Sequence, residues 1–173
     1  GTGFVLANAG QQSTKGIEFD TLYRPTDSID LTFAGTLLDP VYDSFVGASG
    51  VNGVIDLSGE KPAGIHERSF TAGITYNFDL SNGYYGYVRT DYLYESEVRL
   101  VSNVPESLTR ETSMWNASAG LNLDNGVSLQ VWVRNLNNDE FFQSSFPPPI
   151  QAGSFSAYPN QPRTFGLTVA YDF

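Results

Sequence analysis

The chain has 173 residues, of which 14% are aromatic and 16% are charged, and its formal net charge is −10. This acidic balance argues against nucleic-acid binding, because phosphate recognition requires clustered lysine and arginine. The sequence has no cysteine, which excludes a disulfide scaffold and thiolate metal sites, and it has no run of apolar residues long enough for a transmembrane helix.

Alternation of apolar and polar residues with a period of two recurs along the chain and predicts β-strands. Seven such segments occur, in chain order at 15–23, 28–38, 69–80, 84–94, 114–124, 127–135 and 163–173, and a partial eighth strand is predicted around Phe4 to Asn8. No helical period stands out, so the sequence predicts an all-β fold.

The connections between these segments alternate in length. Short turns are predicted at 24–28, 80–83 and 124–126, where Asn-Gly pairs and similar residues favour tight hairpins because they accept a positive φ. Long loops are predicted at 40–67, 95–110 and 137–162. Every long loop of this antiparallel meander would then project from one end, which is typical of outer-membrane β-barrels.

The two faces of the predicted sheet differ in chemistry. Charged residues such as Asp30, Arg89 and Asp172 share one face with Ser, Thr, Asn and Gly, whereas the other face is apolar and carries aromatic residues toward both strand ends. We therefore expect the apolar face to contact lipid and the polar face to line a lumen. The competing interpretation is a soluble all-β domain with the apolar face as its core, but its solvated face would be unusually poor in Lys and Glu.

The inward side chains predict part of a wide barrel. Seven or eight strands can close into a small barrel, but its interior must be filled by side chains. Inward sets such as Ser118, Gly120 and Asn122 are small and would leave voids in a narrow barrel. They suit a wall that lines a wide lumen or packs against another domain.

Several stretches together resemble the C-terminal part of the β-barrel of a TonB-dependent outer-membrane receptor. NAGQQSTKGIEFD (8–20) is similar to a strand motif of the family and is followed by a YRP turn and by LDPVYDSF (38–45). The stretches GEKPAGIHERSFTAGITYNF (59–78), VWVRNLNNDEFF (131–142) and QPRTFGLTVAYDF (161–173) resemble later motifs, in the family's order. In VWVRNLNNDEFF, Phe stands where the family usually has Tyr.

The resemblance implies a meander of seven or eight transmembrane strands within an outer-membrane barrel of about 22 strands. It implies a receptor that imports a scarce ligand such as a ferric siderophore, energised by the TonB complex through an N-terminal plug domain. Residues 1–173 would be the C-terminal segment, without the plug and the earlier strands. Its partners would be membrane lipid, those missing parts and the ligand. Phe173 resembles the terminal aromatic residue that the barrel-assembly machinery reads, and it also fits an aromatic girdle.

Candidate ligand-binding residues lie in the long loops and on the polar face. The loops supply Tyr42, Phe45, His66, Phe141, Phe142, Phe146, Phe155 and Tyr158, and the polar face supplies Arg89 and Arg134. Aromatic loops stiffened by proline can hold a ligand at low entropic cost, but the same rings can instead pack on each other as a lid. The arginines can line a path for anions or pair with carboxylates such as Asp91.

The sequence predicts no enzyme, no metal site and no cofactor. His66 is the single histidine, and a lone histidine in a loop is more often solvated than bound to a metal. One alternative is a small autonomous outer-membrane barrel with an adhesin or structural role, which would close its first strand onto its last. Another is a barrel-borne lipid enzyme with His66 as its base.

Overall fold

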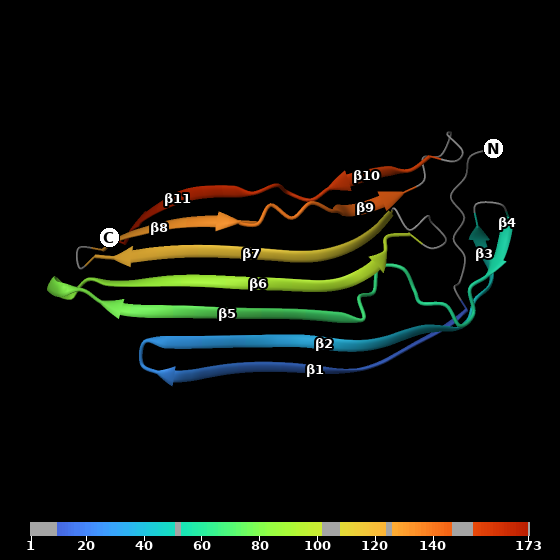
Figure 1. The fold of residues 1–173 in the computed structure, drawn as a ribbon, viewed down its shortest axis with the longest axis horizontal. Helices are drawn as coiled ribbons and strands as arrows, with labels where there is room; N and C mark the ends of the chain where they lie inside the picture. Colours follow the sequence, from blue (N-terminus) through green and yellow to red (C-terminus); the bar gives the residue numbers. More distant parts are fainter. Residues whose placement is uncertain (1–9, 51–52, 102–107, 124–125, 147–153, 173) are drawn as a thin grey trace.

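The computed structural model describes residues 10–50, 53–101, 108–123, 126–146 and 154–172. This part of the chain forms one seven-stranded antiparallel sheet in the order β1 (Gln11–Thr26), β2 (Ile29–Ser44), β5 (Arg68–Asp79), β6 (Tyr85–Arg99), β7 (Thr109–Asn122), β8 (Val127–Arg134) and β11 (Thr164–Tyr171) (Figure 1). Sheet order follows chain order, which confirms the predicted meander. The predicted partial strand at Phe4 to Asn8 and the predicted signal at Phe173 lie outside the described residues.

The two ends of the sheet differ as predicted. At the turn end, residues 27–28 and the short 3-10 turn Ser81–Gly83 connect successive strands, and Leu123 N donates to Val127 O (2.9 Å) where β7 is followed by β8. At the outer end, two long segments carry hairpins of their own, namely β3 (Val46–Gly50) with β4 (Gly53–Asp56), and β9 (Phe142–Phe146) with β10 (Ser156–Pro159) (Figure 1). The described residues contain no helix that is long and apolar enough to cross a membrane.

β2 extends six residues beyond its predicted end at Leu38, through Pro40 to Ser44. The backbone N–H groups of Leu38 and Tyr42 donate to Glu67 O (2.8 Å) and Glu60 O (3.0 Å). Pro40 lies between them on the same side of β2, past Leu37, where the pairing with β5 ends. The strand therefore tolerates proline here, because no ladder hydrogen bond is lost.

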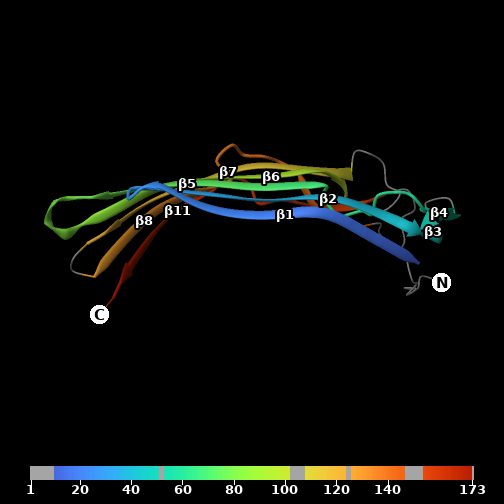
Figure 2. The same ribbon diagram turned by 90° about the horizontal axis from the view of Figure 1, so that it is seen from below.

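The sheet is a single curved layer with open edges. Figure 2 shows it as a shallow arch without a second sheet stacked on it. β1 and β11 form the two edges and do not pair with each other in the described residues, so the closure expected of a small autonomous barrel is not formed. Phe165 and Leu167 are 83% and 66% exposed, which contradicts burial of the apolar face in a soluble core.

The register places most of the apolar residues of the seven strands on one face. Paired residues of antiparallel strands share a face. One face carries pairs such as Phe33↔Ala72, Val88↔Ala119 and Leu129↔Val169, and the other carries Asp30↔Thr75, Asp91↔Asn116 and Gln130↔Thr168. We call the first the lipid face and the second the lumen face. The alternation that the sequence predicts is thus continuous across the whole sheet.

Aromatic rings lie on the lipid face toward both strand ends. A row of rings crosses β1, β2, β5 and β6, with neighbouring centroids between 5.1 Å and 6.3 Å apart, and it consists of Phe19, Phe33, Phe70 and Tyr94. Tyr76 and Phe78 stack 5.9 Å apart nearer the turn end. Two girdles of rings of this kind are expected at the two interfaces of a membrane.

Candidate functional site

A run of Asn and Asp residues fixes the polypeptide that follows β8. β8 ends at Arg134, whereas β7 continues toward the outer end without it. There the Asn137 side chain takes the place of a strand, because its Nδ2 donates to Ser113 O (2.6 Å) and its Oδ1 accepts from Trp115 N (3.0 Å). The Asp139 carboxylate accepts from Ser113 N (2.7 Å). Side chains thereby satisfy both backbone groups of Ser113 and the N–H of Trp115, and the Trp115 carbonyl accepts from the backbone N–H of Leu136 (2.7 Å).

The same run attaches the polypeptide that leads into β11. Asn135 is 3% exposed, has a φ of 53° and donates from Nδ2 to Asp139 O (2.9 Å) and Gln161 O (3.2 Å). Asn160 accepts from Phe141 N (3.0 Å) and donates to Asp139 O (2.8 Å). The two ends of the segment between β8 and β11 are therefore held together, and the backbone of Phe141 is fixed to Asn160.

A pocket of about 540 Å³, which we call the lumen pocket, lies between this segment and the lumen face of the sheet. Leu93 and Met114, which are paired in the register, form its apolar floor. The remaining lining is mostly polar and consists of Glu95, Arg110, Thr112, Asn116, Arg134, Asn135, Phe141, Gln143, Asn160, Gln161 and Pro162. Volumes of this size are common for sites that hold small molecules.

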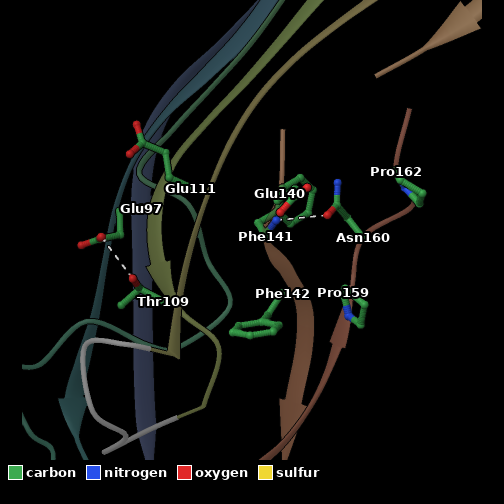
Figure 3. A pocket seen from close by; sticks show the side chains of 9 residues that line it. All are labelled: Glu97, Thr109, Glu111, Glu140, Phe141, Phe142, Pro159, Asn160 and Pro162. Atoms are coloured by element: carbon green, nitrogen blue, oxygen red, sulfur yellow. Dashed lines mark hydrogen bonds between the residues drawn. The ribbon is translucent and has the colours of Figure 1, made fainter. Parts of the chain in front are cut away.

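A second pocket of about 730 Å³, the outer pocket, lies on the other side of Phe141. Figure 3 shows its lining, in which Glu97, Thr109 and Glu111 come from the strands of the wall and Phe142 and Pro159 come from the β9–β10 hairpin. Its residues are Glu97, Thr109, Glu111, Glu140, Phe141, Phe142, Pro159, Asn160 and Pro162. No cluster of three or more metal-ligating side chains is found among the described residues.

His66 joins three elements at the outer end. Its Nδ1 lies 2.5 Å from Ser96 O on β6, and its Nε2 lies 2.6 Å from Arg110 Nη2 on β7. A carbonyl can only accept and a guanidinium can only donate, so Nδ1 carries the hydrogen and Nε2 accepts. Glu95 Oε2 is 3.6 Å from the same Nε2, and Arg110 Nη1 donates to Gln143 O (3.1 Å). The neutral ring therefore links the wall to the outer segments.

The two predicted lumen arginines have different surroundings. Arg89 pairs with Asp91 through two contacts, one of them a 2.9 Å hydrogen bond from Nε, and it also donates to Thr75 Oγ1 (3.2 Å). Arg134 instead lies over the Trp132 ring, with its guanidinium carbon 5.2 Å from the centroid, and it lines the lumen pocket. Pairing within the wall thus accounts for Arg89, whereas Arg134 faces the pocket.

The other predicted site residues fall into two aromatic clusters. Tyr42 is 9% exposed and belongs to a small core under the β3–β4 hairpin, where its ring centroid lies 5.0 Å from that of Phe45. Phe146 and Tyr158 pair across the β9–β10 hairpin at 5.8 Å. Phe155 precedes β10 and is half-buried. The rings of Tyr42 and Phe45 thus pack on each other, as do those of Phe146 and Tyr158. Phe141 lines both pockets, and Phe142 lines the outer pocket.

The sequence analysis did not identify Arg110 and Thr112 as pocket residues, and it did not predict that the Asn and Asp side chains of NLNND bond to the backbone of β7. The spacing NLNND after a strand was a usable signal, because Asn and Asp side chains bond readily to nearby backbone. Arg110 gave no local signal, since its partner His66 is 44 residues away. Its place in the site follows only from the pairing of β6 with β7.

The fold and the site together define a section of an outer-membrane barrel wall with ligand-sized pockets at its outer end. Residues 1–136 match the model of the family "TonB dependent receptor-like, beta-barrel", and the chain belongs to this family. The predicted fold class and the outer-membrane location are thereby confirmed. Members of this family act as receptors and transporters, which fits the prediction that the chain is not an enzyme.

Two solved structures are similar to the chain. One is the ferric yersiniabactin uptake receptor FyuA from Yersinia pestis, with a TM-score of 0.79 and 16% identity over 98% of this chain and 25% of that chain. The other is the siderophore receptor PiuA from Acinetobacter baumannii, with a TM-score of 0.72 and 20% identity over 94% of this chain and 22% of that chain. The chain thus spans about a quarter of the length of these structures. No curated protein sequence matches it.

Proposed function

We propose that the chain is the C-terminal barrel part of a TonB-dependent receptor that binds and imports a scarce small ligand, such as a ferric siderophore. The observation that carries this proposal is the anchoring of Phe141 between two ligand-sized pockets at the outer end of the wall. A ring held by backbone hydrogen bonds contributes contact area without being ordered on binding, so it favours affinity. Family membership and the two receptor-like structures support the same function.

The chemistry of this function is binding and passage, without a covalent step. The lipid face holds the wall in the outer membrane, and the edges of β1 and β11 would pair with the remaining strands, because unpaired backbone groups are strongly disfavoured in lipid. The plug domain would fill the lumen, and the TonB complex would supply energy through it. His66 serves here as a structural link between β6, β7 and the outer segments rather than as a base.

Uptake by cells that carry the full-length receptor tests this proposal. Iron-starved cells should accumulate radiolabelled iron from one member of a panel of ferric siderophores, and the accumulation should require both the receptor gene and a working TonB complex. Replacement of Phe141 and Phe142 together by Ala should reduce uptake. Phe165→Ala is the matched control, since this ring lies on the lipid face. Uptake of no ligand in the panel, or equal uptake without TonB, would contradict the proposal.

A further inference from the structure

We propose that the outer rim of the lipid face carries a binding site for a phosphate-bearing lipid headgroup of the outer leaflet. The site is a groove of about 520 Å³, which we call the rim groove, at the outer end of β1, β2 and β5, which lie side by side (Figure 1). Its lining consists of Lys15, Gly16, Ile17, Leu37, Leu38, Asp39, Glu67 and Arg68. This inference goes beyond the proposed function, because lipid binding here requires neither a transported ligand nor the TonB complex.

The register places the rim groove just outside the row of rings on the lipid face. Arg68 lies two residues beyond Phe70 on β5, toward the outer end. Ile17 and Lys15 lie two and four residues beyond Phe19 on β1, in the same direction. Rows of aromatic rings mark the level at which hydrocarbon gives way to lipid headgroups. The rim groove therefore lies at the depth of the headgroups of the outer leaflet.

Positive charge in the rim groove is free to meet a ligand. Arg68 and Lys15 are exposed, and among the described residues no carboxylate lies within ion-pair distance of either side chain. The Glu67 carboxylate is already paired with Lys61. Two free cations thus stand against one free carboxylate, Asp39, although the chain as a whole has a net charge of −10. This local excess favours an anionic partner.

The shape and chemistry of the rim groove suit a phosphate attached to acyl chains. A guanidinium can bind two phosphate oxygens at once, and the Lys15 ammonium adds a point charge beside it. Ile17 and Leu37, which are 65% and 40% exposed, supply apolar surface on the side that faces the rings. A free phosphate ion would leave this surface uncovered, whereas the first carbons of a lipid would cover it. We therefore assign the groove to a lipid headgroup rather than to an inorganic ion.

Native mass spectrometry of the purified full-length receptor in detergent tests the proposal. Phosphatidic acid is the probe, diacylglycerol with the same acyl chains is the neutral control, and inorganic phosphate is the competitor. We expect the receptor to retain phosphatidic acid in preference to diacylglycerol. Arg68→Gln and Lys15→Gln should each weaken this binding about fivefold, the effect of one basic side chain at a membrane surface. Asp39→Asn should instead tighten it, because the change removes the free carboxylate of the groove.

Arg134→Gln is the matched control, because it removes a guanidinium from the lumen face of the same sheet and should leave lipid binding unchanged. Heat-dependent gel mobility verifies that each variant is folded, so a loss of binding is assigned to the groove. Equal retention of phosphatidic acid by the parent and by the double variant of Arg68→Gln with Lys15→Gln would overturn the proposal. Equal retention of diacylglycerol, or displacement of the lipid by an equal concentration of inorganic phosphate, would overturn it as well.

Discussion

Asn137 Nδ2 donates a 2.6 Å hydrogen bond to the backbone carbonyl of Ser113, a residue 24 positions earlier in the chain. The same amide accepts from Trp115 N, so a side chain bonds to β7 as a peptide group of a neighbouring strand would. The wall can therefore end β8 at Arg134 without leaving β7 unsatisfied. This arrangement gives the NLNND run a structural purpose that is independent of any ligand.

Replacement of Asn137 by Ala should destabilise the outer end of β7. The change leaves the Ser113 carbonyl and the Trp115 N–H without these partners, and a loss of this kind is worth about 1–3 kcal/mol. Hydrogen exchange of the full-length receptor should show faster exchange at Trp115, and Asn137→Gln should not restore the slow rate because its amide is displaced by one methylene. Gln11→Ala is the control at an exposed amide. Unchanged exchange at Trp115 would show that water replaces the side chain.

The sequence predicted the sheet well because membrane strands repeat one simple pattern. Alternation across residues such as Phe165 to Tyr171 identifies both the strand and its faces, and the short turns locate the hairpins. The hairpins β3–β4 and β9–β10 were missed, because their strands have only four or five residues. Alternation of apolar and polar residues with a period of two cannot be recognised over so short a stretch.

The candidate site was harder to predict because it depends on contacts between distant residues. Phe141 and Arg134 were both predicted, but nothing local shows that they line one pocket. The inward glycines also changed meaning once the register was known. Gly120 was interpreted as one of the small residues that suit a wide lumen or a wall packed against another domain, whereas the ring of Tyr87 on the neighbouring strand covers it, as the ring of Trp132 covers Gly166.

A methyl group at Gly166 should destabilise the wall. A Cβ built there would lie 2.4 Å from Trp132 Cζ2, so Gly166→Ala forces the ring to move. Overpacking of this kind destabilises by about 1–3 kcal/mol. Urea unfolding of the receptor in lipid vesicles should show the loss for Gly166→Ala, and Trp132→Leu in the same chain should recover part of it. If the losses of stability from Gly166→Ala and Trp132→Leu simply add in the double variant, the Trp132 ring does not clash with the new methyl group.

A charge on the lipid face should be tolerated far less than one on the lumen face. Val131 lies on the lipid face in the middle of the β8–β11 ladder and is 54% exposed, and Gln130 next to it lies on the lumen face. Val131→Arg should destabilise the barrel by about 2–4 kcal/mol in vesicles, because the guanidinium would lie in hydrocarbon. Gln130→Arg is the matched control and should fold nearly as stably as the parent. Equal losses for the two variants would mean that the faces have been assigned wrongly.

The β3–β4 hairpin should loosen in strong acid. The Asp56 carboxylate accepts from Ser58 Oγ (2.6 Å) and Ser58 N (2.9 Å), and these bonds hold the pKa of Asp56 below its usual value. Ser58 Oγ in turn accepts from Phe45 N (2.8 Å), so the carboxylate supports the small core that contains Tyr42. A depressed pKa stabilises the fold above the unfolded pKa of about 3.9, and the stabilisation is lost as the pH falls through the lower folded pKa.

Hydrogen exchange at Ser58, corrected for the intrinsic effect of pH, measures this loosening. Protection should be constant from neutral pH down to about pH 4 and should fall below it as the carboxylate is protonated. Asp56→Asn should give weaker protection at neutral pH and no further fall in acid, because its amide does not titrate in this range. Glu140→Gln, a change of charge at the outer pocket, should keep the parent profile. An acid transition that persists in Asp56→Asn would assign the effect to another carboxylate.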